Sequence, residues 1–286
     1  SLLEKTAYGE YELLLVDNGS QSEEARIWFD GMTQLGSERI RVIAWPSQDY
    51  PPQGNAAAVG NFAVAQARGE YVLMLNPYAV ITQGDWLTEL LNHAQRPEVG
   101  AVGAKLFNPE GRVVQAGLIL GLHGPAGVPF AGETLHAKGY MYRLQTAHNP
   151  SAVAGDCLML RKAVFAAVGG FDEQDLAQSL NDVDLCLRIG QQGYLVVWTP
   201  HAQLALGAQP PQAADQARSD QEQEVFYKRW LPVIARDPAY NVNLTLEGRG
   251  GVSFVLEPGL RSGWSPFSKS PLPKILALPA NASAIG

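Results

Sequence analysis

The chain has 286 residues, enough for one large domain or two small ones. Hydrophobic residues make up 46% and charged residues 17%, a globular composition that excludes global disorder. The formal net charge of −7 argues against a nucleic-acid partner, because neutralising many phosphates requires clustered Lys and Arg. A single nucleotide needs only a few local donors, so a nucleotide ligand remains compatible with this charge.

In chain order, short apolar runs alternate with helical patterns over the first two hundred residues, which predicts an α/β sheet with parallel crossovers. The predicted strands are 11–16, 41–45, 71–75, 99–104, 113–120, 152–160 and 194–198, and the predicted helices are 22–35, 55–68, 162–168 and 180–191. The run 71–75 is almost wholly apolar, as expected for a strand buried on both faces. A long loop is expected over 121–150, and loops of this length are usually functional or mobile.

After residue 208 the composition changes. A polar helix is expected over 213–230, a loop-like tail rich in Gly, Pro and Ser follows residue 237, and residues 274–279 resemble the start of a new strand. We therefore expect an α/β domain at 1–208, a C-terminal helix and tail at 209–250, and a linker at 251–286 that leads to a further, covalently linked module.

The cysteines and the apolar runs indicate the compartment. Cys157 and Cys186 lie in apolar stretches and are expected to be buried free thiols. No run approaches the roughly 18 apolar residues of a membrane span, and the N-terminus lacks a signal-peptide pattern. We therefore expect a protein without a transmembrane segment. Its expected location is the cytoplasm, including the inner face of the membrane.

Three groups of polar residues stand out, two directly after predicted strands and one at the start of a predicted helix. Ligands of open α/β sheets bind beyond the carboxyl ends of the strands. The first group is Asp17-Asn18-Gly19-Ser20, the second is Asn76-Pro77-Tyr78, and the third is Asn181-Asp182-Val183-Asp184. Each also has a purely structural interpretation. Asp17-Asn18-Gly19 is a common turn signal, and carboxylates in the first turn of a helix stabilise it by about 0.3–1 kcal/mol.

The order of these segments resembles the family 2 glycosyltransferases. The segments are 11–20, 61–91, 100–121, 151–172 and 181–200, and residues 229–246 are similar to the tail of the bacterial branch that builds O-antigen and other rhamnose-rich polysaccharides. The resemblance implies a GT-A fold, with a mixed, mainly parallel sheet and helices on both faces, followed by a C-terminal helix and an extended tail. The family's first strand finds no counterpart, since residues 1–8 look like the end of the helix that follows it.

The resemblance implies a hexosyltransferase that takes a nucleotide-sugar donor, UDP- or dTDP-linked, and transfers the sugar to a saccharide acceptor hydroxyl with inversion. Asp182 matches the family's catalytic base, and Asp17 matches the acidic residue that contacts the nucleotide base. With Asp17, the expected donor-binding residues are Asn18, Asn61, Asn76 and Tyr78.

The positions that hold the family's Mg²⁺ or Mn²⁺ lack metal-ligand residues here. The usual Asp-containing triplet after the buried strand is Asn76-Pro77-Tyr78, and the usual histidine near Leu206 is absent from Ala205-Leu206-Gly207. Hard cations need several oxygen donors, most of them anionic, so we assign no metal ligands and expect poor metal affinity.

Two hypotheses about function follow. The first is an inverting glycosyltransferase of O-antigen or surface polysaccharide biosynthesis, with Asp182 as base. The second, motivated by the absent metal ligands, is a catalytically degenerate module that serves as a scaffold or binds glycan in a multi-domain protein. A nicotinamide-binding domain is excluded, because no G-x-G-x-x-G follows the first strand.

Overall fold

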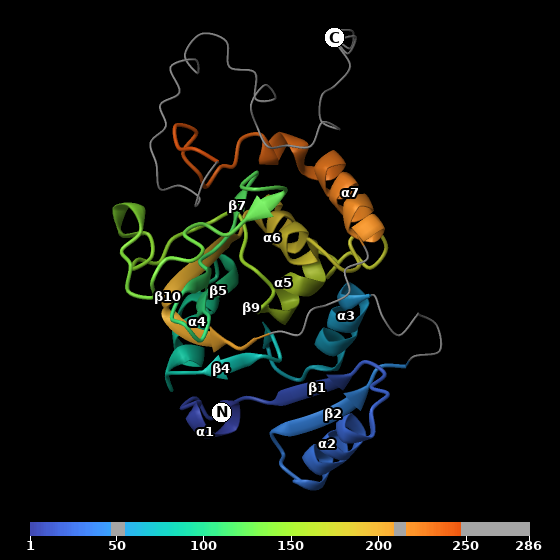
Figure 1. Ribbon diagram of the computed structural model, residues 1–286. Helices are drawn as coiled ribbons and strands as arrows, with labels where there is room; N and C mark the ends of the chain where they lie inside the picture. Colours follow the sequence, from blue (N-terminus) through green and yellow to red (C-terminus); the bar gives the residue numbers. More distant parts are fainter. Residues whose placement is uncertain (47–54, 209–215, 247–286) are drawn as a thin grey trace.

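The computed structural model describes residues 1–46, 55–208 and 216–246 (Figure 1). The helices are α1 (Leu2–Lys5), α2 (Glu23–Gln34), α3 (Ala56–Gln66), α4 (Trp86–Ala94), α5 (Lys162–Ala167), α6 (Asn181–Gln191) and α7 (Gln216–Ile234), with a 3₁₀ turn η1 (Tyr140–Tyr142). The strands are β1 (Leu13–Asp17), β2 (Ile40–Ala44), β3 (Tyr71–Leu75), β4 (Ala79–Ile81), β5 (Val99–Phe107), β6 (Val113–Gln115), β7 (Ile119–Leu120), β8 (Ala126–Gly127), β9 (Cys157–Arg161) and β10 (Leu195–Leu206).

The strands form one large sheet and two small ones. The large sheet has the order β3-β9-β5-β10-β4, with β6 added beside β5, while β1 pairs with β2 and β7 pairs with β8. Among the described residues, β5 and β10 are the one parallel pair of the large sheet, and its other pairs are antiparallel. The expectation of a mixed sheet is confirmed, whereas the expectation of mainly parallel pairing is wrong. Apolar periodicity carries no information about strand direction, which the connections decide.

Side chains alternate across the large sheet and build a core on each face. One core contains Ala101 and Leu158 and packs against α3, α5, α6 and α7; the other contains Val102 and Met159 and packs against α4. Helices therefore cover both faces, as expected. Both cysteines are buried free thiols, also as expected.

The β1–β2 pair forms as the sequence predicts. Its two strands are parallel, with Leu13 opposite Ile40, and α2 makes the crossover between them. Ser22 caps α2 by accepting the N–H of Ala25, and Asn55 caps α3 by accepting the N–H of Ala58. These caps explain why both helices begin within a residue of the predicted positions.

Several elements differ from the predicted ones. The predicted strand 113–120 is split into β6 and β7, with Gly117 at φ +80° between them. The predicted strand 152–160 becomes regular only at Cys157, and β10 continues to Leu206 instead of ending at 198. Strand β4 and helix α4 were not predicted.

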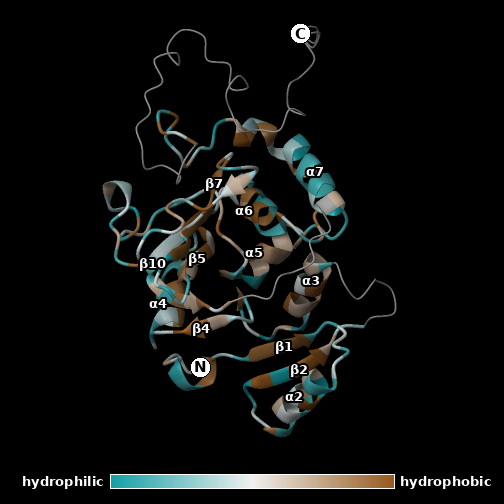
Figure 2. Cartoon of the chain, in the orientation of Figure 1, coloured by the Kyte–Doolittle hydropathy of each residue, from teal (hydrophilic) through white to brown (hydrophobic). Residues whose placement is uncertain are grey.

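The C-terminal region is described as far as residue 246, and the predicted strand 274–279 lies outside the described residues. Helix α7 carries many hydrophilic residues (Figure 2) and still inserts Phe226, Tyr227 and Trp230 into the core beside α6. The described part of region 209–250 thus packs on the core formed by the preceding residues. No helix in the described ranges combines the length and apolar character of a membrane span.

Candidate active site

The site lies where the end of β3 meets the beginning of β9. Leu75 pairs with Cys157 across the two antiparallel strands, so Asn76 comes to lie beside Asp156. The amide Nδ2 of Asn76 donates to Oδ1 of Asp156 at 2.7 Å, and the backbone N–H of Asn76 donates to the carbonyl of Asp156 at 2.9 Å. The Oδ1 of Asn76 in turn accepts the N–H of Tyr78 at 2.9 Å.

Asp182 joins this group from the first turn of α6. Its Oδ2 accepts the N–H of Gly155 at 2.7 Å, and its Oδ1 accepts the N–H of Val183 at 2.8 Å. A β-carbon on Gly155 would lie 3.5 Å from the carboxyl of Asp182, so α6 approaches this backbone closely. Asn76, Asp156, Gly155 and Asp182 thus form a row from the end of β3 to the start of α6, joined by hydrogen bonds and by the peptide bond between Gly155 and Asp156.

The electrostatics of this row raise the pKa of Asp182. Burial of the Asp182 carboxyl raises its pKa, the N–H groups of Gly155 and Val183 oppose that rise, and the negative charge of Asp156 adds to it. Asp182 forms no ion pair among the described residues. A half-buried carboxylate of raised pKa suits a general base.

Asp17 ends β1 and shapes the turn that follows it. Its Oδ1 accepts the N–H of Ser20 at 2.9 Å, and Gly19 supplies a positive φ of +76°. The structural interpretation of Asp17-Asn18-Gly19 as a turn is therefore correct. Asn18 is exposed within this turn. The backbone carbonyl of Asp17 accepts the N–H of Trp45, whose ring makes an edge contact with Phe62 of α3.

Helix α3 connects this turn to the approach to α6, as Figure 1 also shows, with α3 lying between the β1–β2 pair and α5. The N–H of Ala57 donates to the carbonyl of Ala177 at 3.0 Å, and Asn55 Nδ2 donates to the carbonyl of Glu173. Residues 173–177, which precede α6, therefore contact the N-terminal end of α3, and Trp45, which is hydrogen-bonded to the end of β1, contacts the middle of the same helix.

Asn61 has a different environment from the other predicted donor residues. Its Nδ2 donates to the carbonyl of Phe171 and to Glu173, and its Oδ1 accepts the N–H of Phe171. It lines a pocket of about 460 Å³ with Arg188 and Arg229. The structure does not place it in the row that contains Asn76 and Asp182, and its role in donor binding stays a prediction.

The two positions without metal ligands do come together. Tyr78 accepts the N–H of Gly207 through its carbonyl at 2.9 Å, and Ala79 pairs with Leu206. Within the described ranges, no group of three or more His, Cys, Asp or Glu could hold a metal ion. Carboxylate oxygens of Asp156 and Asp182 already accept hydrogen bonds from Asn76 and from backbone N–H groups. This set of oxygen ligands does not fit Mg²⁺ or Mn²⁺.

Asp156 is the site residue that the sequence analysis missed. It follows Gly155 and directly precedes an apolar strand, the same kind of strand-end position that singled out Asn76. The difference is that Asp156 stands before its strand. An antiparallel β9 is needed to bring the beginning of one strand to the carboxyl end of another.

Residues 1–169 match the family described as Glycosyl transferase family 2. The chain belongs to this family of glycosyltransferases. The match includes Asp17, Asn76 and Asp156 and ends before α6.

Three relatives of this glycosyltransferase are similar to it over more of the chain than the family match covers. The chain is 42% identical over 255 residues to protein y4gI of Sinorhizobium fredii (86% of this chain, 27% of that protein) and 37% identical over 252 residues to the O-antigen biosynthesis protein RfbC of Myxococcus xanthus (86% and 19%). It is 30% identical over 215 residues to an N-acetylglucosaminyl-diphospho-decaprenol L-rhamnosyltransferase of Mycobacterium tuberculosis (67% and 65%). The chain thus spans about a fifth to a quarter of the first two relatives.

A solved structure supports the fold. The mannosyltransferase PcManGT from Pyrobaculum calidifontis, in complex with GDP-Man and Mn²⁺, superposes with a TM-score of 0.53 at 16% identity, over 80% of this chain and 58% of that one. At this identity the likeness shows the GT-A fold and not the ligands. The expected fold family is confirmed.

Proposed function

We propose that this chain carries the catalytic part of an inverting glycosyltransferase of O-antigen or related surface polysaccharide synthesis. It takes a UDP- or dTDP-linked sugar as donor and a saccharide hydroxyl as acceptor. Support comes from RfbC, named for O-antigen biosynthesis, and from the Mycobacterium relative, named for rhamnosyl transfer.

The observation that carries the proposal is the placement of Asp182 in the row that begins at the end of β3. In the proposed reaction Asp182 removes the proton of the acceptor hydroxyl. The acceptor oxygen forms a bond to the anomeric carbon, while the bond from that carbon to the diphosphate breaks and its electron pair leaves with the nucleoside diphosphate. The proton remains on Asp182, and the configuration of the sugar is inverted.

The donor occupies the strand ends beside this base. Asp17 and Asn18 contact the nucleotide base, with the carboxylate of Asp17 accepting the imide N–H of uracil or thymine. Asn76 and Tyr78 contact the sugar diphosphate, and Asn61 supports the donor pocket from α3.

The first test replaces Asp182 with Asn, which keeps the shape of the side chain and removes the base. We expect Asp182→Asn to lower kcat by about 10²–10⁴-fold, the usual contribution of a general base, while the Kd for UDP or dTDP stays within about twofold. Calorimetry measures nucleotide binding, and released nucleoside diphosphate measures transfer.

Asp85→Asn is the matched control. Asp85 also stands at the start of a helix, is exposed, and makes no side-chain cap hydrogen bond. Its replacement should leave both kcat and Kd unchanged. An Asp182→Asn variant with the wild-type kcat would remove Asp182 from the mechanism.

The lack of metal-ligand residues at Asn76 and Tyr78 favours a second function. In this alternative the chain is a catalytically degenerate module that positions a neighbouring domain or binds glycan. Calorimetry with UDP and dTDP, with and without Mn²⁺, separates the two functions. Nucleotide binding with measurable transfer supports the enzyme. A chain that binds neither nucleotide under either condition supports the degenerate module.

A further inference from the structure

Helix α7 contacts the approach to the catalytic helix through Glu222. This side chain is 4% exposed, and its carboxylate accepts the N–H of Gln178 at 3.1 Å, the N–H of Ser179 at 2.7 Å and the hydroxyl of Ser179 at 2.6 Å. Arg218, one turn earlier on α7, donates to the same carboxylate at 3.2 Å. Ser179 precedes Asp182 by three residues, so Glu222 holds the backbone immediately before α6.

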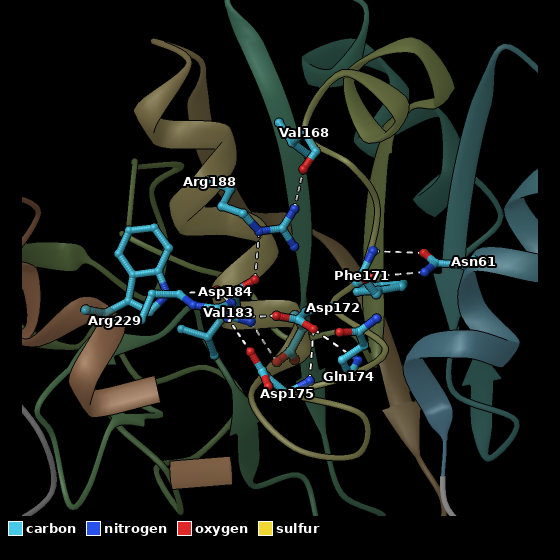
Figure 3. Close-up of polar contacts among 12 residues, drawn as sticks. Asn61, Val168, Phe171, Asp172, Gln174, Asp175, Val183, Asp184, Arg188 and Arg229 are labelled. Carbon is cyan, nitrogen blue, oxygen red and sulfur yellow. Dashed lines mark hydrogen bonds and ion pairs between the residues drawn. The ribbon is translucent and has the colours of Figure 1, made fainter. Parts of the chain in front are cut away.

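A second anchor lies two turns further along α7. Arg229 pairs with Asp172 at 2.8 Å, with Asp175 at 3.2 Å and with Asp184 at 2.9 Å (Figure 3), and Trp230 Nε1 donates to the same oxygen of Asp184 at 2.8 Å. The side chain of Asp184 is fully buried.

The buried charge of Asp184 is satisfied from both helices. Its Oδ1 receives Arg229 and Trp230 from α7, and its Oδ2 receives Arg188 of α6 at 2.7 Å. Removing one partner of a buried, hydrogen-bonded charge leaves the rest uncompensated, so this contact strongly prefers one position of α6 relative to α7.

Between the two anchors the backbone takes a conformation that it does not adopt readily. Leu180, which precedes α6, has φ +61°, and such a residue is held there only by its surroundings. The Asp182 carboxylate itself is oriented by backbone N–H groups. Its position therefore follows the backbone of 178–184, which α7 fixes on both sides.

We propose that α7 is a positioning element for the transfer reaction, in which Glu222, Arg229 and Trp230 are positioning residues that hold segment 178–184 and thereby aim Asp182 at the acceptor. This inference rests on the proposed function. It assigns a task to a helix that lies beyond the residues matched to the family.

The core packing of α7 allows this role to be tested without unfolding the helix. Phe226, Tyr227 and Ile234 are buried against the core and hold the helix there. Glu222→Ala removes the first anchor, Glu222→Gln keeps one acceptor oxygen as the milder variant, and Arg229→Lys keeps the charge without the two-pronged geometry. Glu224→Gln is the control on the same helix, because the side chain of Glu224 is 44% exposed and pairs with exposed Lys228.

The first measurement is hydrogen exchange of the amides in 176–184, which needs no activity. Glu222→Ala should speed the exchange of these amides by about tenfold, because a buried hydrogen bond lowers the population of the open state by about that factor. Glu222→Gln should have a smaller effect. Glu224→Gln should match the wild type. Equal exchange in Glu222→Ala and Glu224→Gln overturns the proposal.

The second measurement is the pH dependence of kcat. We expect Glu222→Ala to lower kcat by about 10–10²-fold, as expected for a base displaced by about 1 Å, with the KM for donor within about twofold. Water reaching Asp182 should also move the acid limb of the kcat profile to lower pH, and Glu222→Gln should recover part of both effects. Faster exchange with an unchanged kcat overturns the proposal. A wild-type chain that shows no transfer contradicts the proposed function instead, and the exchange result still decides whether α7 holds the segment.

Discussion

Asp182 and Asp156 stand close enough for their charges to interact, and this shapes the acid–base behaviour of the site. Burial of the Asp182 carboxyl raises its pKa above the ordinary value of 3.8, and the neighbouring carboxylate of Asp156 raises it further. Asp156 is itself tied to Asn76 by a 2.7 Å hydrogen bond. Asp156, which only the structure revealed, thus adds to the rise in pKa that burial produces.

The acid limb of the kcat profile follows from this arrangement. The base must be deprotonated to act, so a raised pKa makes activity fall at a higher pH than it would for an ordinary aspartate. Asp156→Asn removes one negative charge and should lower the pKa of Asp182, which moves the acid limb to lower pH. Steady-state rates across the acid range measure it. A limb that stays in place or moves to higher pH would contradict the coupling.

At the scale of elements, α6 can approach β5 closely because β5 carries glycine where they meet. A β-carbon on Gly100 would overlap Ile189 and would lie 2.7 Å from the β-carbon of Tyr194. The C-terminal part of α6 therefore packs directly on the backbone of β5.

Gly100→Ala should destabilise the fold by about 1–3 kcal/mol, because the new methyl group overpacks the contact between α6 and β5. Gly190→Ala is the comparison. Gly190 lies in α6, and a β-carbon there would have open space within 4 Å, so alanine should be neutral or stabilising by up to about 1 kcal/mol. Urea unfolding midpoints measure both. Equal midpoints would show that the β5 contact is not tight.

At the scale of the whole molecule, the β1–β2 pair is packed differently from the large sheet. Neither strand has a buried residue, and α2 has none, whereas β5 is buried along all but its last residue and has strands on both sides. Apolar side chains of α2, among them Ile27 and Trp28, are exposed. The nucleotide side of the proposed site is thus the more loosely packed.

Native-state hydrogen exchange should reveal this difference. We expect the amides of β1 and β2 to exchange at least about tenfold faster than those of β5 and β10, because opening a pair with few buried contacts requires less free energy. Exchange followed by mass spectrometry on one sample provides its own internal reference. Similar protection in both sheets would show that the pair opens only with the whole fold.

Much of this protein is readable from local sequence signals. Ser22 and Asn55 predict where helices begin, the apolar run 71–75 predicts a strand of the large sheet, and the polar residues at its end and at the start of α6 predict Asn76 and Asp182 as site residues. These signals depend on contacts within a few residues, so they survive without knowledge of the fold. The order of these segments along the chain was enough to indicate the family.

Strand direction and long-range contacts were decided by tertiary structure. The antiparallel course of β9 brings Asp156 to Asn76, and Asn61 of α3 is hydrogen-bonded to Phe171. Helix α7 reaches back by more than forty residues to hold Ser179 and Asp184. Local sequence signals do not determine these contacts, because they join residues far apart in the chain and depend on how whole elements pack.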